Sequence, residues 1–125
     1  MREGFEFTAI DHKTDAGGKS MLVKSADGNR RSFLGVDFVV LAQGKDTMIA
    51  KMLYKSGDRV PMHKHPNEQS GYVLSGKYRV RFGEFDQMIG PGDSYSIPNN
   101  MEHSIEIIEP GEVVDCFSPP REDYR

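Results

Sequence analysis

Three histidines are the residues of this sequence best suited to chemistry. His63 and His65 are separated by one residue, and His103 lies in the C-terminal half of the chain. On a β-strand, residues two apart project from the same face, so the first two imidazoles would point toward one place. Imidazole nitrogens suit a divalent ion such as Zn, Ni, Fe, Mn or Co. A His-x-His pair alone is more often solvated surface, so the metal hypothesis depends on His103 joining the pair.

A fourth metal ligand is expected just after the histidine pair, at Gln69 or at its neighbour Glu68. Alternation along a strand favours Gln69, because Glu68 would then face outward. An amide oxygen carries no charge, so three histidines and a glutamine leave the ion's charge uncompensated. A missing carboxylate forfeits an attraction of about 4 kcal/mol for charges about 4 Å apart at moderate effective dielectric. We therefore expect a weakly held metal that is a strong Lewis acid.

The elements that must position these ligands are short β-strands. Thirteen glycines and seven prolines divide the chain into segments rich in Val, Ile, Phe and Tyr, and no stretch keeps a helical period over three turns. The predicted strands are residues 5–10, 21–23, 31–33, 36–42, 48–54, 71–74, 77–82, 85–89, 94–97, 103–108 and 113–117, and residues 11–20 are predicted to form a polar loop. Many short strands at regular spacing indicate a sandwich or a barrel. No linker interrupts the chain, so residues 1–125 are predicted to form a single domain.

Composition excludes several classes of partner. The 16 basic and 19 acidic residues are scattered and give a net charge of −3, whereas a nucleic-acid-binding protein needs a concentrated positive surface. The longest apolar run, residues 38–42, is far too short to cross a bilayer, and the N-terminal residues lack the apolar core of a signal peptide. The single cysteine, Cys116, suits a reducing compartment. We therefore expect a cytoplasmic protein with neither nucleic acid nor membrane as a partner.

The spacing of two groups of residues resembles the two motifs of the cupin family. The first group is Gly57, His63, His65, Gln69 and Gly76, and the second is Gly92, Pro98 and His103. The resemblance implies an all-β, cupin-type jelly-roll β-barrel in which His63, His65, Gln69 and His103 hold one divalent metal ion, and it implies frequent dimers.

Three positions depart from the family pattern. Gln69 stands where the usual ligand is Glu, and Ile107 replaces an Asn that normally ends the second motif. Asn100 replaces a glycine, and asparagine tolerates the left-handed backbone well. The departures leave the expected fold intact, and Gln69 changes the expected chemistry.

The last predicted strand carries an acid among apolar neighbours. Val113, Asp115 and Phe117 share one face, while Val114 and Cys116 share the other. Since both faces are otherwise apolar, Asp115 is expected to be partly buried rather than simply exposed. A carboxyl held near a metal site is a candidate base with an environment-tuned pKa.

A narrower resemblance is to the pectin-degradation cupins named KdgF. It rests on the segments HPNEQSGYVLSG and VVDCFSPPREDYR. It implies that Asp115 and Arg121 serve an active site, and that the enzyme opens the ring of 4,5-unsaturated uronic acid monosaccharides to linear keto-uronates. Arg121 would hold the carboxylate of this small anionic sugar bidentately. The resemblance to small cupins also predicts a homodimer, paired through sheet faces or exchanged terminal strands.

Other assignments remain open on the sequence. Arg79 and Arg81 share a strand face and either line the pocket or form an outward basic face, and Tyr124 either closes the site or frays. The chain is alternatively another metal-dependent cupin enzyme, such as a dioxygenase or a sugar isomerase, or a non-catalytic sugar-binding or sensing cupin.

Overall fold

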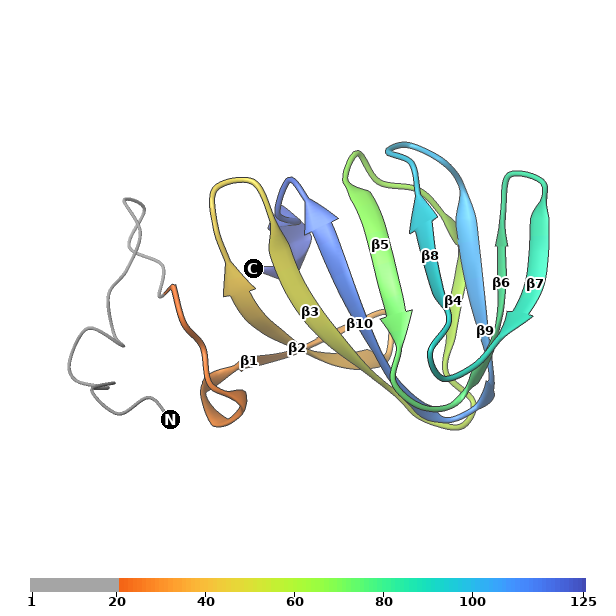
Figure 1. Cartoon of the computed structure of the whole chain (residues 1–125), viewed down its shortest axis with the longest axis horizontal. Coiled ribbons are helices and arrows are strands. Elements are labelled where there is room, and N and C mark those ends of the chain that lie inside the picture. The colour runs from red at the N-terminus through yellow and green to blue at the C-terminus, as the bar shows by residue number, and fades with distance from the viewer. Residues whose placement is uncertain (1–20) are drawn as a thin grey trace, which may run out of the picture.

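Two antiparallel sheets make up the described part of the chain, which is residues 21–125 of the computed structural model (Figure 1). The six-stranded sheet has the order β1 (Asn29–Phe33), β2 (Val36–Gln43), β3 (Met48–Tyr54), β10 (Gly111–Ser118), β5 (Glu68–Val73) and β8 (Ser94–Ile97). The four-stranded sheet has the order β4 (Arg59–His63), β9 (His103–Glu109), β6 (Lys77–Phe82) and β7 (Phe85–Ile89). Two short 3₁₀ helices, η2 (Ser25–Asp27) and η3 (Glu122–Tyr124), flank the strands.

The prediction of an all-β chain is confirmed, with two local errors. Residues 21–23 form no strand, and η2 follows them instead. Strand β4 was not predicted, because its centre is Pro61; at the edge of a sheet, where β4 lies, a missing backbone N–H is tolerated. The predicted strand at 5–10 and the predicted loop at 11–20 lie outside the described residues. For the same reason, a single domain over residues 1–125 stays a prediction.

The inner face of the six-stranded sheet consists of three rows of cross-strand neighbours. One end has Met48, Phe117, Gln69 and Ile97, the middle has Ala50, Asp115, Gly71 and Tyr95, and the other end has Met52, Val113 and Val73. In the four-stranded sheet, His63, His103 and Phe82 form one row, and Val60, Ile105 and Val80 form the next. We call the end of the barrel interior with Gln69 and His103 the site end, and the end with Val73 and Tyr78 the closed end.

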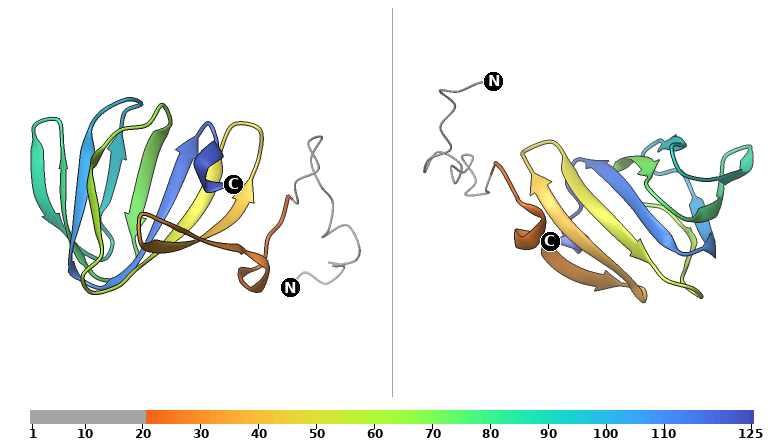
Figure 2. Two further views of the ribbon diagram at one scale, coloured as in Figure 1. Left: turned by 180° about the vertical axis from the view of Figure 1, so that it is seen from behind. Right: turned by 60° about the horizontal axis from the view of Figure 1, so that its bottom comes forward.

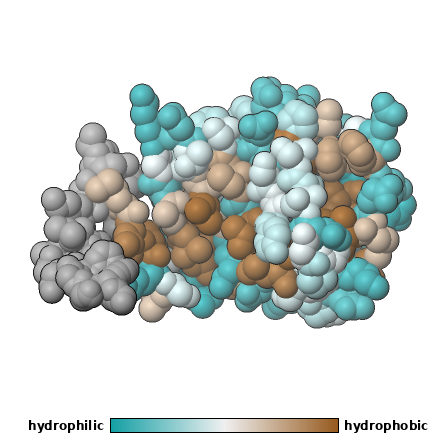
Figure 3. Space-filling view, viewed as in Figure 1, coloured by the Kyte–Doolittle hydropathy of each residue, from teal (hydrophilic) through white to brown (hydrophobic). Residues whose placement is uncertain are grey.

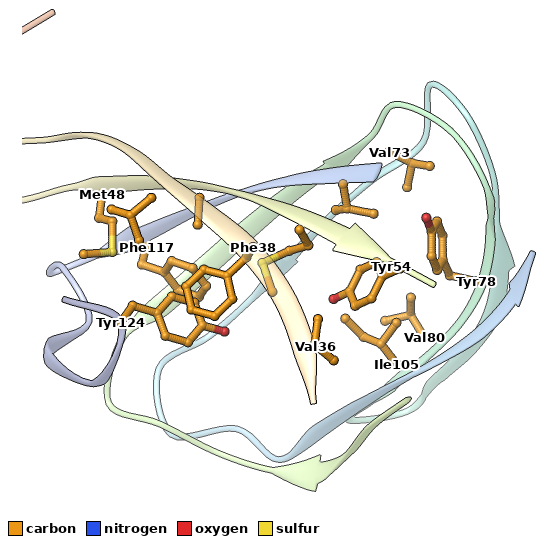
Figure 4. Close-up of a cluster of buried hydrophobic side chains, with 14 residues drawn as sticks. Val36, Phe38, Met48, Tyr54, Val73, Tyr78, Val80, Ile105, Phe117 and Tyr124 are labelled. Carbon is orange, nitrogen blue, oxygen red and sulfur yellow. The ribbon is translucent and has the colours of Figure 1, made fainter. Parts of the chain in front are cut away.

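Buried apolar side chains fill the space between the sheets (Figure 4). At the closed end, the rings of Tyr54 and Tyr78 have centroids 5.4 Å apart. Toward the site end, Phe117 and Phe38 pack against Tyr124, with ring centroids 5.3 and 4.2 Å from it. Seen from behind, η3 lies on the inner side of the six-stranded sheet, in front of β3 and β10 (Figure 2). The C-terminal segment is therefore part of the core rather than a frayed end.

Two loops and the C-terminal tail meet at the site end. The backbone N–H of Asn100 donates to the carbonyl of His65 (2.8 Å), which joins the β8–β9 turn to the β4–β5 loop. Asn100 has the expected left-handed conformation, with a φ of 62°. The Asn67 amide donates to the carbonyl of Pro119 (2.6 Å), which joins the same loop to the tail. Within residues 21–125, no helix has the length and apolarity needed to cross a membrane.

Candidate metal centre

His63, His65 and His103 converge at the site end. The candidate ligand atoms of the three imidazoles all lie within 4.8 Å of one another, and their ring centroids are 4.3 to 5.6 Å apart. His63 and His103 are direct neighbours on β4 and β9, whereas His65 reaches the group from the loop after β4. The prediction that the first two histidines share a strand is therefore wrong, although their rings do come together.

A β-bulge aims His63 inward. Val60 pairs with Ile105 and His63 pairs with His103, so β4 has one residue more than β9 between these two pairs. Both Val60 and His63 consequently belong to the inner rows although they are three residues apart. Bulges are common beside functional sites, where they redirect a side chain in this way.

Each of the three imidazoles is oriented by a backbone carbonyl two residues away. The Nδ1 atoms of His63, His65 and His103 lie 2.8, 2.9 and 2.9 Å from the carbonyl oxygens of Pro61, Asn67 and Met101. Because a carbonyl only accepts, each Nδ1 is the protonated nitrogen, and each Nε2 carries the free lone pair. This is the arrangement that fixes the tautomer of histidines bound to metals.

Two further contacts fit a cation among these nitrogens. Among the described residues, Nε2 of His103 is the buried side-chain nitrogen or oxygen without a hydrogen-bond partner, and such an atom is costly to leave unsatisfied. Nε2 of His65 lies 3.0 Å from Oε1 of Gln69, so two lone pairs face each other. Ligands bonded at about 2.1 Å and at right angles lie about 3 Å apart. The donor set present therefore fits a divalent ion.

The acidic neighbour of Gln69 does not enter the site. Gln69 is 4% exposed, and Glu68 is exposed on the other face of β5, as strand alternation predicts. The four candidate ligands are thus uncharged when His is neutral. Burial lowers the pKa of His103 to about 4 and also lowers the pKa of His65, which keeps both imidazoles neutral at pH 7 and able to bind a metal.

Asp115 lies in the row next to these ligands and is 1% exposed. Its Oδ1 accepts a hydrogen bond of 2.7 Å from the hydroxyl of Tyr95, and the Gln69 side chain also favours its charged form. Since Oε1 of Gln69 faces His65, its amide nitrogen is the group that favours the Asp115 carboxylate. Burial raises the pKa of Asp115 to about 6, against the opposing effects of Tyr95, Gln69 and Arg121. A buried carboxyl with a pKa near neutrality is suited to moving a proton.

The comparisons with known proteins agree with this geometry. Residues 50–117 match the family model described as the Cupin domain, and this stretch is more than half of the 125 residues. The chain belongs to the cupin family.

Two solved structures extend the likeness to the whole barrel. An RmlC-like cupin from Shewanella frigidimarina superposes with a TM-score of 0.77 and 24% identity, over 83% of this chain and 95% of that chain. KdgF from Halomonas sp. superposes with a TM-score of 0.75 and 25% identity, over 83% of this chain and 97% of that chain. No curated protein matches the sequence. The predicted jelly-roll cupin fold and the resemblance to KdgF are confirmed.

The tail of this cupin folds back so that Arg121 is buried, with 3% exposure. The guanidinium lies over the ring of Tyr124, 3.9 Å from its centroid, and 5.1 Å from the centroid of Phe117. Its Nε and Nη2 donate to the two carboxylate oxygens of Asp123 at 3.0 and 2.7 Å. The charge of Arg121 reaches His65, His103 and Asp115, whose pKa values it lowers.

Arg79 and Arg81 belong to the outward face. Arg79 makes a bidentate ion pair with Asp86 (2.8 Å) and lies 3.8 Å from Glu106. Arg81 is exposed and lines an open cleft of about 530 Å³ that also includes Met62 and Phe85. Neither arginine enters the barrel interior with the histidines, because Tyr78 and Val80 take the inward positions of β6.

Sequence reasoning missed Asn67, Tyr95 and Asp123. Alternation along residues 94–97 could have placed Tyr95 on the inner face with Ile97. Nothing local indicates Asn67, because it bonds to a residue of the tail. Asp123 lies two residues from Arg121, and the order of these two charges along the chain is the signal that could have found their ion pair.

Proposed function

We propose that this cupin is a metal-dependent enzyme that opens the ring of 4,5-unsaturated uronate monosaccharides and yields linear keto-uronates. The observation that carries the proposal is the buried carboxyl of Asp115 beside three convergent imidazoles. A sensing or storage role has no need of a buried acid with a pKa of about 6. The resemblance of the tail to KdgF supplies the substrate class.

The ligands in this proposal are Nε2 of His63, His65 and His103 and Oε1 of Gln69, around one divalent ion of the Zn, Ni, Fe, Mn or Co group. When bound, the ion supplies Lewis acidity to a sugar oxygen. Because the four protein ligands carry no charge, the site favours an anionic substrate. The Gln69 amide also holds Asp115, whereas a glutamate in its place would repel that carboxylate.

Asp115 moves the proton in this proposal. As a carboxylate it takes the proton of the anomeric hydroxyl while the bond between the anomeric carbon and the ring oxygen breaks. The products of that step are an aldehyde, an enolate and protonated Asp115. Protonated Asp115 then returns the proton to the former alkene carbon, and the enolate becomes the ketone. The reaction is an isomerisation and needs no oxidant or reductant.

Arg121 binds the substrate carboxylate in this proposal. Its buried guanidinium already binds a carboxylate bidentately, that of Asp123, so the surroundings fit this ion pair. Asp123 takes Nε and Nη2, and the Nη1 side remains for the substrate. A guanidinium is suited to this task because its donors match the geometry of a carboxylate.

The rival enzyme class is supported less well. A mononuclear iron dioxygenase commonly binds its metal with two histidines and a carboxylate. Here no carboxyl group of the described residues belongs to the cluster of His63, His65 and His103, and Asp115 instead accepts a hydrogen bond from Tyr95. Loss of the ultraviolet absorbance of unsaturated galacturonate distinguishes the proposed enzyme from a sugar isomerase and from a non-catalytic sugar-binding cupin.

We also propose a two-fold homodimer in the cytoplasm. The outer face of the six-stranded sheet has an apolar group made of two cross-strand pairs, Ile49 with Cys116 and Tyr72 with Val114. Figure 3 shows apolar side chains gathered across this side of the molecule. Tyr72 is 50% and Ile49 is 37% exposed. Such an exposed apolar group suits a symmetric contact. The free Cys116 is half-buried, and a free thiol is compatible with a reducing compartment.

The test combines elemental analysis of the purified protein with an ultraviolet assay on unsaturated galacturonate. We expect about one divalent ion per chain and loss of the absorbance of the unsaturated uronate on addition of the protein. Metal-loaded protein that leaves this absorbance unchanged, while the sugar still binds, would point to the non-catalytic sugar-binding cupin instead.

A further inference from the structure

The middle row of the six-stranded sheet brings three residues side by side. Gly71 on β5 pairs with Tyr95 on β8 and with Asp115 on β10, so the glycine lies between the other two. The hydroxyl of Tyr95 nevertheless donates to Oδ1 of Asp115 at 2.7 Å. Strands two apart in a sheet are separated by about 9–10 Å, so the tyrosine ring must cross the strand between them.

The missing side chain of Gly71 makes this crossing possible. A Cβ atom built on Gly71 would collide with Cζ and the hydroxyl of Tyr95 and with Oδ1 of Asp115. The backbone of Gly71 does not adopt a positive φ, so the glycine is not required by the local backbone conformation. The constraint that selects glycine here is the space between Tyr95 and Asp115.

The resulting contacts hold the Asp115 carboxyl from one side. Tyr95 donates to it from β8, and the Gln69 side chain in the neighbouring row also favours the carboxylate. The hydrogen bond from Tyr95 stabilises the carboxylate, since hydrogen bonds to a charged group are the stronger kind. The carboxyl group is therefore fixed in rotation at a position where a small misorientation would impair proton transfer.

We propose that Tyr95 is a positioning residue, whose hydroxyl reaches through the gap at Gly71 to hold the Asp115 carboxylate in the orientation that transfers the proton. This inference rests on the proposed function. It adds to it a residue that is not one of the four candidate metal ligands, and it assigns Gly71 the role of keeping the path open.

The experiment compares two matched deletions of a buried hydroxyl. Tyr95→Phe removes the donor to Asp115. Tyr78→Phe removes an equivalent hydroxyl, which donates to the carbonyl of Ser75 (2.8 Å) at the closed end. Assays at several pH values compare the plateau value of kcat, so that a change in the pKa of Asp115 does not enter the comparison. We expect Tyr95→Phe to lower kcat about tenfold or more, with KM and metal content unchanged, and Tyr78→Phe to keep the wild-type kcat.

A second variant tests the same contact from the other side. Gly71→Ala keeps the tyrosine hydroxyl and separates it from Asp115 by filling the gap, so it should lower kcat as much as Tyr95→Phe does. Adding Gly71→Ala to Tyr95→Phe should lower kcat further only through the collision of the new Cβ atom with Asp115, because the contact with the hydroxyl is already lost. A kcat for Tyr95→Phe within twofold of the wild type, or an equal loss in Tyr78→Phe, would overturn the proposal.

Crystal structures of the metal-loaded variants separate this proposal from the proposed function. If the wild-type protein fails to open unsaturated uronates, the proposed function is wrong, and the position of Asp115 still decides the claim about Tyr95. A rotated or split Asp115 carboxyl in Tyr95→Phe, with the wild-type position kept in Tyr78→Phe, supports positioning. An Asp115 carboxyl that keeps its wild-type orientation in Tyr95→Phe refutes it.

Discussion

The two ends of the barrel interior are built from the same strands and are held together differently. At the closed end, β5 contributes Val73, β10 contributes Val113 and β6 contributes Tyr78, all buried among apolar neighbours. At the site end, β5 contributes Gln69 and β9 contributes His103, which are equally buried. Apolar contacts are non-directional, so the closed end tolerates changes of shape. Each buried polar group at the site end needs a specific partner.

The lesson of this difference is that stability and chemistry are separated along the barrel axis. A substitution at the closed end should lower the free energy of unfolding and leave the site's properties unchanged. A substitution of a buried polar residue at the site end should change the properties of the site and have little effect on the free energy of unfolding. The reason is that these polar groups contribute little net stability until a metal is bound.

The largest expected effect comes from a pair of substitutions on β9. His103→Ala removes a candidate ligand and should abolish metal binding and activity, along with any rise in Tm on adding metal. Ile105→Ala, two residues along the same inner face, should lower the free energy of unfolding by about 2–5 kcal/mol and keep the metal. Elemental analysis measures the metal content of each variant, and thermal melting with and without a chelator measures its stability and the effect of the metal on Tm. A His103→Ala protein that retains stoichiometric metal would show that the imidazole cluster is not the metal site.

The next largest effect concerns the acid. Asp115→Asn keeps the shape of the side chain and removes the base, so it should lower kcat roughly 10²–10⁴-fold with metal content unchanged. The control is Asp93→Asn, at the closed end, where the carboxylate accepts a hydrogen bond from the backbone of Gly90 (2.8 Å). The control should turn over at the wild-type rate. Normal turnover by Asp115→Asn would exclude Asp115 as the proton-transfer group.

The contrast between the ends also explains how far sequence reasoning could go. Strands were predictable because alternation of apolar and polar residues is local, and the bounds of 48–54, 77–82, 85–89 and 94–97 agree with the structure. The strand that was missed, at 59–63, is an edge strand with a proline and a bulge. Both features interrupt the alternating pattern on which strand prediction depends. The strand predicted at 21–23 is absent.

The site was predictable only in part, because most of its contacts depend on how the chain folds rather than on a local pattern. The convergence of His63, His65 and His103 followed from the resemblance of the spacing to the cupin motifs. The ion pair between Arg121 and Asp123 and the contact of Tyr95 with Asp115 depend on a turn geometry and on cross-strand register, which no local pattern encodes. The carbonyls that orient the imidazoles are backbone groups, which carry no sequence signal.

A smaller effect is expected from exchanging the uncharged ligand for a charged one. Gln69→Glu should bind the metal about tenfold or more tightly, since it adds an attraction to the ion. It should also slow turnover, because it loses the amide donor to Asp115 and places a second carboxylate beside it. Chelator competition measures the first property and kcat the second. Tighter metal binding with unchanged kcat would mean that the amide of Gln69 is dispensable for Asp115.

The smallest effect on the site is expected from substitutions on the outer face of the six-stranded sheet. These substitutions should change only the mass of the assembly. We expect light scattering to give about twice the chain mass of 14.1 kDa. Tyr72→Glu should give the monomer, because a two-fold contact brings the two introduced charges together in an apolar surface.

The matched control is Phe85→Glu on β7, which should stay dimeric. Phe85 is 58% exposed and lies outside the apolar group. Metal content and kcat should be unchanged in both variants, since Tyr72 points away from the interior that contains Gln69 and Asp115. A Tyr72→Glu protein that remains a dimer would place the contact elsewhere, and a wild-type protein at 14.1 kDa would rule the dimer out.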